Sequence, residues 1–495
     1  MERFLSQVDE MAQSMLAAWD VPGASVSITK DDELVYARGF GNRELGNVSP
    51  VDEHSIFAIG SLTKAFTAAA IGLLVQEDRL AWDDRVLQYL PGFQLYDPLD
   101  TRQITVRDLL CHRSGLGTFH GDFMGYGSHY TRAQLLERVR FIPPAFRLRT
   151  AYGYANLMYV AAGEVITAVT GQTWEEFVQQ RLIEPLGMRR SFTSIAALEG
   201  LDNIAQPHEM HYGRLVQIPY LSDAYGPAGS IFSCTADLSC WLRLQLNQGR
   251  VGDVQILMED ILAETRSPQV LLPIPPDQKT LLPRRHFQTY GLGWSLSDYA
   301  GRLVAMHTGG VDGMLSLAAF VPEERLGVAI LTNRLPNSMF VALFRFILDE
   351  VLGFHDRDWQ AEYLELDRKA EERKNEAMKK LKKARLAGTH PSLPLERYSG
   401  VYTNSIYGAV TVTCQDDRLA LHLGAHPGVF GQLEHWHLDT FYTHWSAPSL
   451  EQSFVTFSPG VVGCIETLRF KVADFVDPLE YVFVKQEEEG EGNRG

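Results

Sequence analysis

A serine and a lysine three residues apart open an apolar stretch of the chain. Ser61 and Lys64 are followed by small and apolar residues, Ala65-Phe66-Thr67-Ala68-Ala69-Ala70. Three residues is just under one helical turn, so both side chains project from one helix face about 5–6 Å apart at Cβ. A serine hydroxyl is a weak nucleophile that needs a base beside it. Burial lowers a lysine pKa from about 10.4 towards the range in which lysine accepts a proton. The pair predicts covalent catalysis with Ser61 as nucleophile and Lys64 as its partner.

A structural role for the same two residues is the alternative. The serine would cap the helix N-terminus, and the lysine would reach solvent along its aliphatic stem. No acidic residue lies near Lys64 in the sequence, and the apolar surroundings favour a buried lysine. The helix N-terminus also offers backbone N–H groups to a developing oxyanion.

Two further motifs follow in order, Tyr154-Ala155-Asn156 and His307-Thr308-Gly309-Gly310. With Ser-x-x-Lys they resemble the S-x-x-K, Y-x-N and K-T-G motifs of the class C β-lactamase and penicillin-binding-protein-like serine hydrolases. The stretches Leu109-Leu110-Cys111-His112-Arg113-Ser114-Gly115-Leu116 and Glu184-Pro185-Leu186-Gly187-Met188 are also similar to that family. The resemblance spans roughly residues 10–350. It implies an α/β sheet domain plus a helical lobe, with the active site at their interface.

The resemblance also implies roles for these residues. Tyr154 matches the phenol that carries a proton between nucleophile and leaving group, which requires a nearby cation such as Lys64 to lower its pKa. Asn156 would orient Lys64 and a substrate amide. The oxyanion hole would consist of the backbone N–H groups of Ser61 and Gly310. Thr308 and Gly309 would lie along the bound substrate, where a glycine removes the obstacle of a Cβ.

His307 departs from the β-lactamase pattern because it replaces the lysine of K-T-G. A histidine with a reference pKa of about 6.5 is mostly neutral at pH 7. It is a poor partner for a carboxylate, but it can donate a hydrogen bond to the substrate or to Tyr154. H-x-G variants resemble the peptidase, amidase and esterase branches. We expect activity to fall at low pH as His307 becomes charged.

The elements that position these motifs are predicted as a sheet closed by both ends of the first domain. Residues 24–29 and 34–37 predict a hairpin, and a helix precedes it with Phe4, Val8, Met11 and Met15 on one face. Further strands are predicted at 291–294, 303–306, 315–320 and 328–331. The fold class is α/β: an antiparallel sheet flanked by helices plus an all-helical lobe, followed by a small antiparallel β-barrel. The barrel resembles the lipocalin-like domain appended to some members of the family.

We place a catalytic domain at 1–358, a charged linker helix at 359–390, the barrel at 391–486 and a disordered acidic tail at 487–495. The linker has acidic residues first and basic residues later, which suits the helix macrodipole.

Composition narrows the function further. Of the 495 residues 45% are hydrophobic and 21% charged, and the net charge is −16. An acidic surface disfavours nucleic acid and anionic membranes as partners. The five cysteines form no metal-binding pattern, so neither a metal nor another cofactor is expected. The N-terminus lacks the apolar region of a signal peptide, which predicts a cytoplasmic protein, or a secreted or periplasmic one if the sequence was trimmed.

The predicted function is a serine hydrolase that cleaves ester or amide bonds of small acyl or peptide substrates, including those with D-amino acids. Three alternatives stay open: a β-lactamase, an acyltransferase or peptide cyclase that uses the same acyl-enzyme, and a non-catalytic scaffold that polymerises. A homo-oligomer is compatible with the sequence.

Overall fold

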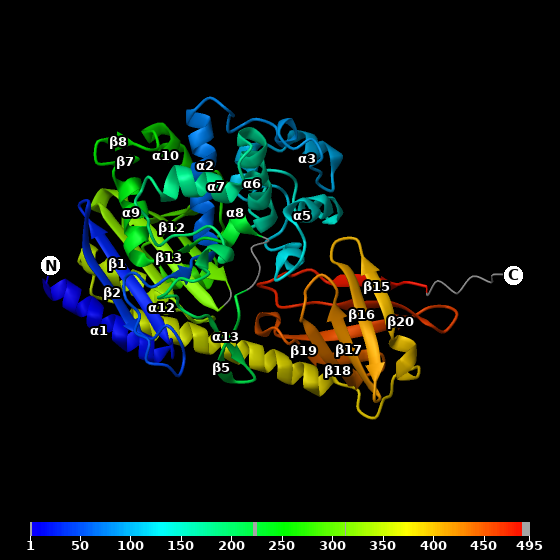
Figure 1. The fold of residues 1–495 in the computed structure, drawn as a ribbon. Helices are drawn as coiled ribbons and strands as arrows, with labels where there is room; N and C mark the ends of the chain where they lie inside the picture. The colour runs from blue at the N-terminus through cyan, green and yellow to red at the C-terminus, as the bar shows by residue number, and fades with distance from the viewer. Residues whose placement is uncertain (1, 221–224, 312, 488–495) are drawn as a thin grey trace.

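The computed structural model describes residues 2–220, 225–311 and 313–487, and it contains a sheet unit (residues 2–352) and a barrel (residues 400–485) joined by one long helix (Figure 1). The tail predicted to be disordered lies, from residue 488 on, outside the described residues.

An antiparallel sheet of eight strands forms the centre of the sheet unit. In spatial order its strands are β2 (Glu33–Gly41), β1 (Gly23–Lys30), β14 (Leu326–Thr332), β13 (Met314–Val321), β12 (Arg302–Val311), β11 (Ser295–Tyr299), β10 (Gln288–Tyr290) and β9 (Val270–Leu271). The N-terminal hairpin β1–β2 therefore pairs with the last strand of the unit, as the sequence predicts. Strands β1 and β14 are buried on both faces along nearly their whole length. Their residues are accordingly apolar, β-branched or small rather than alternating between apolar and polar.

One face of the sheet is covered by α1 (Glu2–Ala18) and α12 (Met339–Leu352), which lie below it in Figure 1. The buried side of α1 consists of Val8, Ala12 and Met15, at three- and four-residue spacing. These helices and the sheet enclose one of the two apolar cores.

The other face is covered by α9 (Thr235–Leu246) and the helical lobe, seen above the sheet in Figure 1. At the centre of the lobe, α2 (Thr63–Gln76) is buried almost throughout and packs against α6 (Asn156–Thr170) and α8 (Gly226–Gly229). The remaining helices of the lobe are α3 (Pro98–Gln103), α4 (Val106–Leu110), α5 (Arg132–Arg138), α7 (Trp174–Val178) and α10 (Glu259–Thr265). The helix α11 (Pro276–Leu281) instead packs through Leu281 against the core on the α1–α12 face. Three two-stranded pairs complete the unit: β3 (Phe57–Ala58) with β6 (Phe232–Ser233), β4 (His208–His211) with β5 (Arg214–Gln217), and β7 (Arg250–Val251) with β8 (Val254–Gln255).

The predicted strand at 291–294 is wrong. Those residues form the turn between β10 and β11, and the strands lie on either side of it. Gly293 has φ of +79°, and a Cβ there would lie 2.8 Å from the Lys64 carbonyl oxygen. The chain turns here because the helix that carries Lys64 passes against it.

The helix α13 (Trp359–Ala384) connects the sheet unit to the barrel. The barrel closes through eight antiparallel strands: β15 (Gly400–Asn404), β16 (Gly408–Gln415), β17 (Arg418–Leu423), β18 (Phe430–His437), β19 (Thr440–His444), β20 (Gln452–Pro459), β21 (Ile465–Phe470) and β22 (Tyr481–Lys485). Closure leaves no unpaired edge strand.

The barrel contacts the helical lobe at the short helix η3 (Asp122–Gly125). The Phe123 ring stacks on His426 at 4.4 Å and on Tyr481 at 5.4 Å between ring centroids. The Phe123 amide donates a hydrogen bond to the Asp477 carboxylate at 3.4 Å. The barrel thus supports the segment that, as shown below, lines the candidate site.

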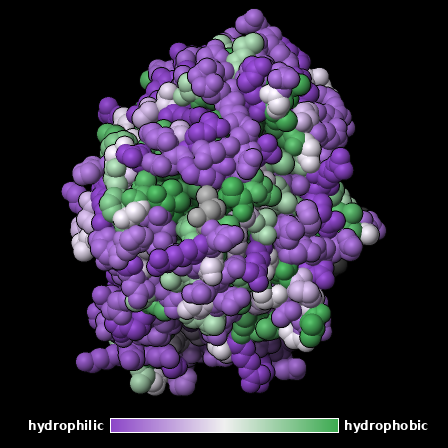
Figure 2. All heavy atoms as spheres, turned by 90° about the vertical axis from the view of Figure 1, so that its left-hand side faces the viewer, coloured by the Kyte–Doolittle hydropathy of each residue, from purple (hydrophilic) through white to green (hydrophobic). Residues whose placement is uncertain are grey.

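The face of the molecule in Figure 2 is mostly hydrophilic, with apolar side chains gathered across its middle. None of the helices in the described part of the chain is long and apolar enough to cross a membrane. Among those same residues no three His, Cys, Asp or Glu side chains gather as a metal site would require.

Candidate active site

The candidate nucleophile lies where the short helix η1 (Gly60–Leu62) leads into α2, against strand β12. Ser61 is partly exposed and lines a cleft. Its neighbour Gly60 has φ of +51°, and a Cβ there would lie 2.9 Å from the Gly310 amide nitrogen. Glycine at position 60 therefore allows the backbone of Ser61 to approach β12 closely.

Lys64 is completely buried, and its Nζ lies 2.9 Å from Ser61 Oγ. The same Nζ donates a hydrogen bond to the Ala228 carbonyl oxygen at 2.7 Å. Burial lowers the pKa of Lys64 to about 7, although the nearby Asp122 carboxylate opposes that shift. An appreciable fraction of Lys64 is therefore neutral at pH 7 and can accept the serine proton.

Tyr154 lies above this pair, with its ring centroid 4.7 Å from Lys64 Nζ. The side chains of Tyr154 and Ser61 share a hydrogen bond. The expectation that Lys64 lowers the phenol pKa is wrong, because burial raises the pKa of Tyr154 well above 10 and the bond to Ser61 offsets this only in part. Tyr154 is therefore protonated and can donate a hydrogen bond. Of Tyr154 and Lys64, only Lys64 changes its protonation state near pH 7.

Asn156 begins α6, but its side chain does not take the orientation that the sequence suggests. Its Nδ2 donates to Asp122 Oδ2 at 2.6 Å, and among the described residues Asn156 forms no hydrogen bond with Lys64. Asp122 is a residue that the sequence analysis missed. It is buried, its Oδ1 has no hydrogen-bond partner in the described chain, and burial raises its pKa well above 3.8. No motif around Asp122 in the sequence could have identified it.

His307 on β12 is buried and hydrogen-bonded through both ring nitrogens. Nδ1 lies 2.7 Å from the Thr308 carbonyl oxygen, and Nε2 lies 2.9 Å from the Tyr290 hydroxyl. A carbonyl oxygen only accepts, so Nδ1 carries the proton and Nε2 accepts from Tyr290. Burial and the charge of Lys64 lower the pKa of His307 to about 3. The histidine is neutral, as predicted, but neither of its nitrogens is free to donate to a substrate or to Tyr154.

A second buried histidine, His112, packs among the tyrosines of the site. Its ring centroid lies 4.2 Å from that of Tyr154 and 4.7 Å from that of Tyr290. Its Nδ1 accepts a hydrogen bond from the Ala155 amide at 3.1 Å, which fixes the chain between Tyr154 and Asn156. His112 belongs to the 109–116 stretch that resembles the family, so a signal for it was present in the sequence.

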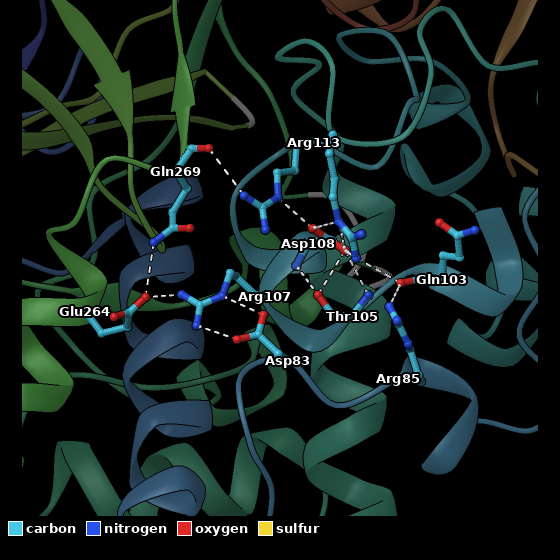
Figure 3. Close-up of polar contacts among 10 residues, drawn as sticks. Asp83, Arg85, Gln103, Thr105, Arg107, Asp108, Arg113, Glu264 and Gln269 are labelled. Carbon is cyan, nitrogen blue, oxygen red and sulfur yellow. Dashed lines mark hydrogen bonds and ion pairs between the residues drawn. The ribbon is translucent and has the colours of Figure 1, made fainter.

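Buried charges hold the segment that carries His112 (Figure 3). Asp108 on α4 is fully buried and accepts from Arg113 Nε at 2.6 Å and from Arg149 Nη2 at 2.6 Å. Its Oδ2 also accepts from the Thr105 amide at 3.0 Å, which caps the helix. The two arginines lower the pKa of Asp108 despite its burial.

Strand β12 is paired on only one side where it passes the site. Its neighbour β11 pairs with residues 302–306, whereas β13 pairs with 305–311. Thr308 and Gly310 are exposed on this stretch and line the cleft, while Gly309 is buried. A Cβ on Gly309 would lie 2.0 Å from the Ile59 carbonyl oxygen, so this glycine serves close packing against η1. The Gly310 amide lies beside η1, where it can form an oxyanion hole with the Ser61 amide.

The cleft has a volume of about 930 Å³ and extends from Ser61 along the sheet to helix α13. Residues of the barrel, Ser449, Phe475 and Val476, form part of its wall. It is large enough for a peptide of several residues. The sheet, the lobe and the barrel thus form a cleft with Ser61 in its lining, beside a buried lysine that can be neutral at pH 7.

Comparison with known families agrees with this geometry. The family model described as Beta-lactamase matches residues 8–352, and the model described as a domain of unknown function, DUF3471, matches residues 384–489. The latter covers the closed barrel, which the sequence analysis described as lipocalin-like.

Individual relatives cover much of the chain. It is 28% identical over 428 residues to the unguisins hydrolase ungD of Aspergillus violaceofuscus, covering 80% of this chain and 74% of that protein. The structure of the octameric penicillin-binding protein homologue from Pyrococcus abyssi superimposes with a TM-score of 0.64 at 22% identity, covering 97% of this chain and all of that one. A D-stereospecific amidohydrolase from Streptomyces superimposes with a TM-score of 0.54 at 26% identity, covering 66% of this chain and 94% of that one.

Proposed function

The chain belongs to the Beta-lactamase family of serine hydrolases, and from that premise we propose that it hydrolyses amide bonds of small peptides, including peptides with D-residues, through an acyl-enzyme on Ser61. The observation that carries the proposal is the contact of 2.9 Å between Lys64 Nζ and Ser61 Oγ. A lysine with a pKa of about 7 can remove the serine proton at neutral pH.

The acylation step follows from this pair. Ser61 Oγ attacks the substrate carbonyl carbon as its proton moves to Lys64 Nζ. The carbonyl oxygen becomes an oxyanion that accepts hydrogen bonds from the backbone N–H groups of Ser61 and Gly310. Each such donor is typically worth a factor of about 10²–10³ in rate.

The departing amine needs a proton, and Tyr154 is placed to supply it. Its pKa is raised, so the phenol is protonated throughout the working range. As the C–N bond breaks, the phenolic proton goes to the leaving nitrogen. The proton that Lys64 took from Ser61 then passes to the phenolate. Water then attacks the acyl-enzyme by the reverse route, which releases the acid and restores Ser61.

The relatives support the substrate class. One acts on unguisins and another is a D-stereospecific amidohydrolase. The strand edge at Thr308 and Gly310 offers main-chain groups to an extended peptide, which suits recognition of a backbone rather than of one side chain. Neutral His307 provides no charge for a carboxylate on that strand, which favours a peptidase or amidase over a β-lactamase.

A covalent label tests the mechanism. We expect a fluorophosphonate probe to add once to the protein, with the adduct on Ser61 by peptide mapping and absent in Ser61→Ala. A matched pair of D- and L-aminoacyl p-nitroanilides then tests the substrate class. A wild-type protein without an adduct, or an adduct that persists in Ser61→Ala, contradicts the mechanism. Equal turnover of the D- and L-substrates contradicts the stereochemical part alone.

A further inference from the structure

Three arginines line the cleft, Arg285, Arg345 and the exposed Arg373. The first two are buried, and the proposed mechanism does not use them. Arg285 follows α11, and Arg345 lies on α12, on the sheet face opposite the helical lobe. Both line the same cleft as Ser61.

Both guanidinium groups are buried with unsatisfied donors. Arg345 is 3% exposed and Arg285 is 6% exposed. In the described part of the chain, Nε and Nη1 of Arg345 and Nε of Arg285 have no hydrogen-bond partner. Arg285 Nη2 donates a hydrogen bond to Gln278 Oε1 at 2.8 Å.

Three carboxylates near the two arginines accept hydrogen bonds from other groups. Asp298, whose charge acts on Arg285, accepts from the His286 and Phe287 amides at 2.8 and 2.9 Å. Asp349, one helical turn after Arg345, accepts from the Tyr299 hydroxyl at 2.6 Å and from Trp359 Nε1 at 2.9 Å. Asp367 on the cleft wall accepts from Trp19 Nε1 and Ser338 Oγ, each at 2.7 Å. Within the residues that the structure describes, neither arginine forms an ion pair with any of them.

Aromatic rings hold one of the arginines in place. The Arg345 guanidinium carbon lies 5.6 Å from the Tyr299 ring centroid and 5.3 Å from that of Phe344. The charge of Arg345 also contributes to lowering the pKa of Arg285, after the larger effect of burial, so the two cations are close enough to repel each other. Two buried like charges with free N–H groups are unfavourable unless an anion is bound between them.

We propose that Arg285 and Arg345 bind the carboxylate at the far end of the substrate whose scissile bond lies at Ser61. This inference rests on the proposed function and identifies its substrates as peptides or acyl compounds with an anionic end. A planar carboxylate matches the forked guanidinium groups, which donate two parallel hydrogen bonds to its oxygens. His307, being neutral, leaves the recognition of this charge to the arginine pair.

Substrates that vary only in the position of a carboxylate test the proposal. Mono-p-nitrophenyl esters of α,ω-dicarboxylic acids of increasing length place the charge on the acyl side, and each has a neutral methyl-ester counterpart. S-acetyl thioesters of ω-mercaptocarboxylic acids place it on the leaving-group side. In one of the two series we expect kcat/KM of the acid to exceed that of its neutral counterpart by about tenfold or more at a particular length.

Variants then connect that preference to the arginines. Arg285→Met and Arg345→Met should reduce the acid-to-neutral ratio at that length to near one, mainly through KM. Arg302→Met is the matched control, because Arg302 pairs with Glu324 at 2.7 Å and does not line the cleft. It should retain the wild-type ratio. Binding can be measured without turnover. The free diacid should raise the melting temperature of Ser61→Ala, and this rise should be lost in the double variant Ser61→Ala/Arg345→Met.

The outcomes separate the possibilities. A ratio near one at every length in both series overturns the proposal, and so does a ratio that the arginine variants leave unchanged. A thermal shift with the free diacid but no length dependence means that the pair holds a separate anion, which also contradicts the proposal. Failure of the proposed function looks different, because turnover of the neutral esters would then be absent or insensitive to Ser61→Ala.

Discussion

The Tyr290 hydroxyl donates a hydrogen bond to His307 Nε2 at 2.9 Å, and this contact determines what the histidine can do. With Nδ1 bound to the Thr308 carbonyl oxygen, the ring has no donor left for a substrate. Its pKa of about 3 keeps it neutral at any pH at which the enzyme is studied. His307 therefore shapes the site without titrating in it, in contrast to the expectation from the sequence.

The low-pH limit of activity is predicted to belong to Lys64. Its neutral form accepts the Ser61 proton, so kcat/KM should rise with pH, about tenfold per unit below pH 7, and level off above it. The measurement is a pH profile of kcat/KM for a neutral p-nitrophenyl ester. In His307→Gln the midpoint of this limb should stay near 7. A midpoint that follows the residue at position 307 contradicts the assignment.

Removal of Lys64 should abolish activity and stabilise the fold. Its pKa is about 7 in the folded protein and about 10.5 when unfolded, so the unfolded chain binds the extra proton between these values. The charge thus disfavours folding at low pH, and the penalty disappears as pH rises towards 10.5. Lys64→Met should gain on the order of 3 kcal/mol in unfolding free energy at pH 7, after allowance for the two lost hydrogen bonds.

Denaturant unfolding of Lys64→Met and wild type at pH 7 and pH 10.5 measures this gain. The difference should shrink at the higher pH. Lys30→Met, at a half-buried lysine in the N-terminal hairpin, serves as the control and should show no such pH-dependent gain. A variant that is less stable than wild type at pH 7 would show that burial does not lower the lysine pKa.

Asp108 is predicted to be the most sensitive acidic residue for stability. Asp108→Ala leaves Arg113 and Arg149 without their buried partner, and the loss should be about 3–5 kcal/mol. Asp83→Ala is the control, since Asp83 is mostly exposed and its pair with Arg107 is worth at most about 1 kcal/mol. Thermal unfolding followed by circular dichroism compares the two. Equal losses contradict the role of the Asp108 cluster in holding the His112 segment.

Phe475 of the barrel is predicted to limit the size of the substrate. It is half-exposed and lines the cleft, so Phe475→Ala should raise kcat/KM for long-chain p-nitrophenyl esters several-fold relative to the acetate. Phe430→Ala, at a similarly exposed barrel residue outside the cleft, should leave this ratio unchanged. The same ratio in Phe475→Ala and wild type would mean that the barrel wall does not contact substrate.

Local patterns in the sequence predicted much of the fold. The spacing of Val8 and Met15 indicated α1, and the two β-prone runs at 24–29 and 34–37, on either side of a polar turn, indicated the β1–β2 hairpin; both are confirmed. The strand at 291–294 failed because its apolar residues are buried for another reason: Trp294 packs against Trp241 of α9 and Phe320 of β13, with ring centroids 6.5 Å and 5.0 Å away. Those contacts join residues far apart in the sequence, and no local pattern encodes them.

The sequence predicted which residues form the candidate site, but not which hydrogen bonds join them. The proximity of Ser61 and Lys64 follows from helix geometry, and the structure brings Tyr154 to the same pair. The partners of Asn156 and His307 do not follow, because Asp122 and Tyr290 reach them from other elements of the chain. A hydrogen bond between distant segments depends on how the whole chain packs, and local sequence patterns do not encode that packing.

The reacting groups and the far wall of the cleft lie in separate stretches of this chain. Ser61, Lys64, Tyr154 and the β12 edge all lie before residue 312, whereas α13 and the barrel contribute the far wall of the cleft. A recombination point after α12 would exchange that wall and keep the reacting groups in place, provided that the new barrel also packs against Phe123 of η3.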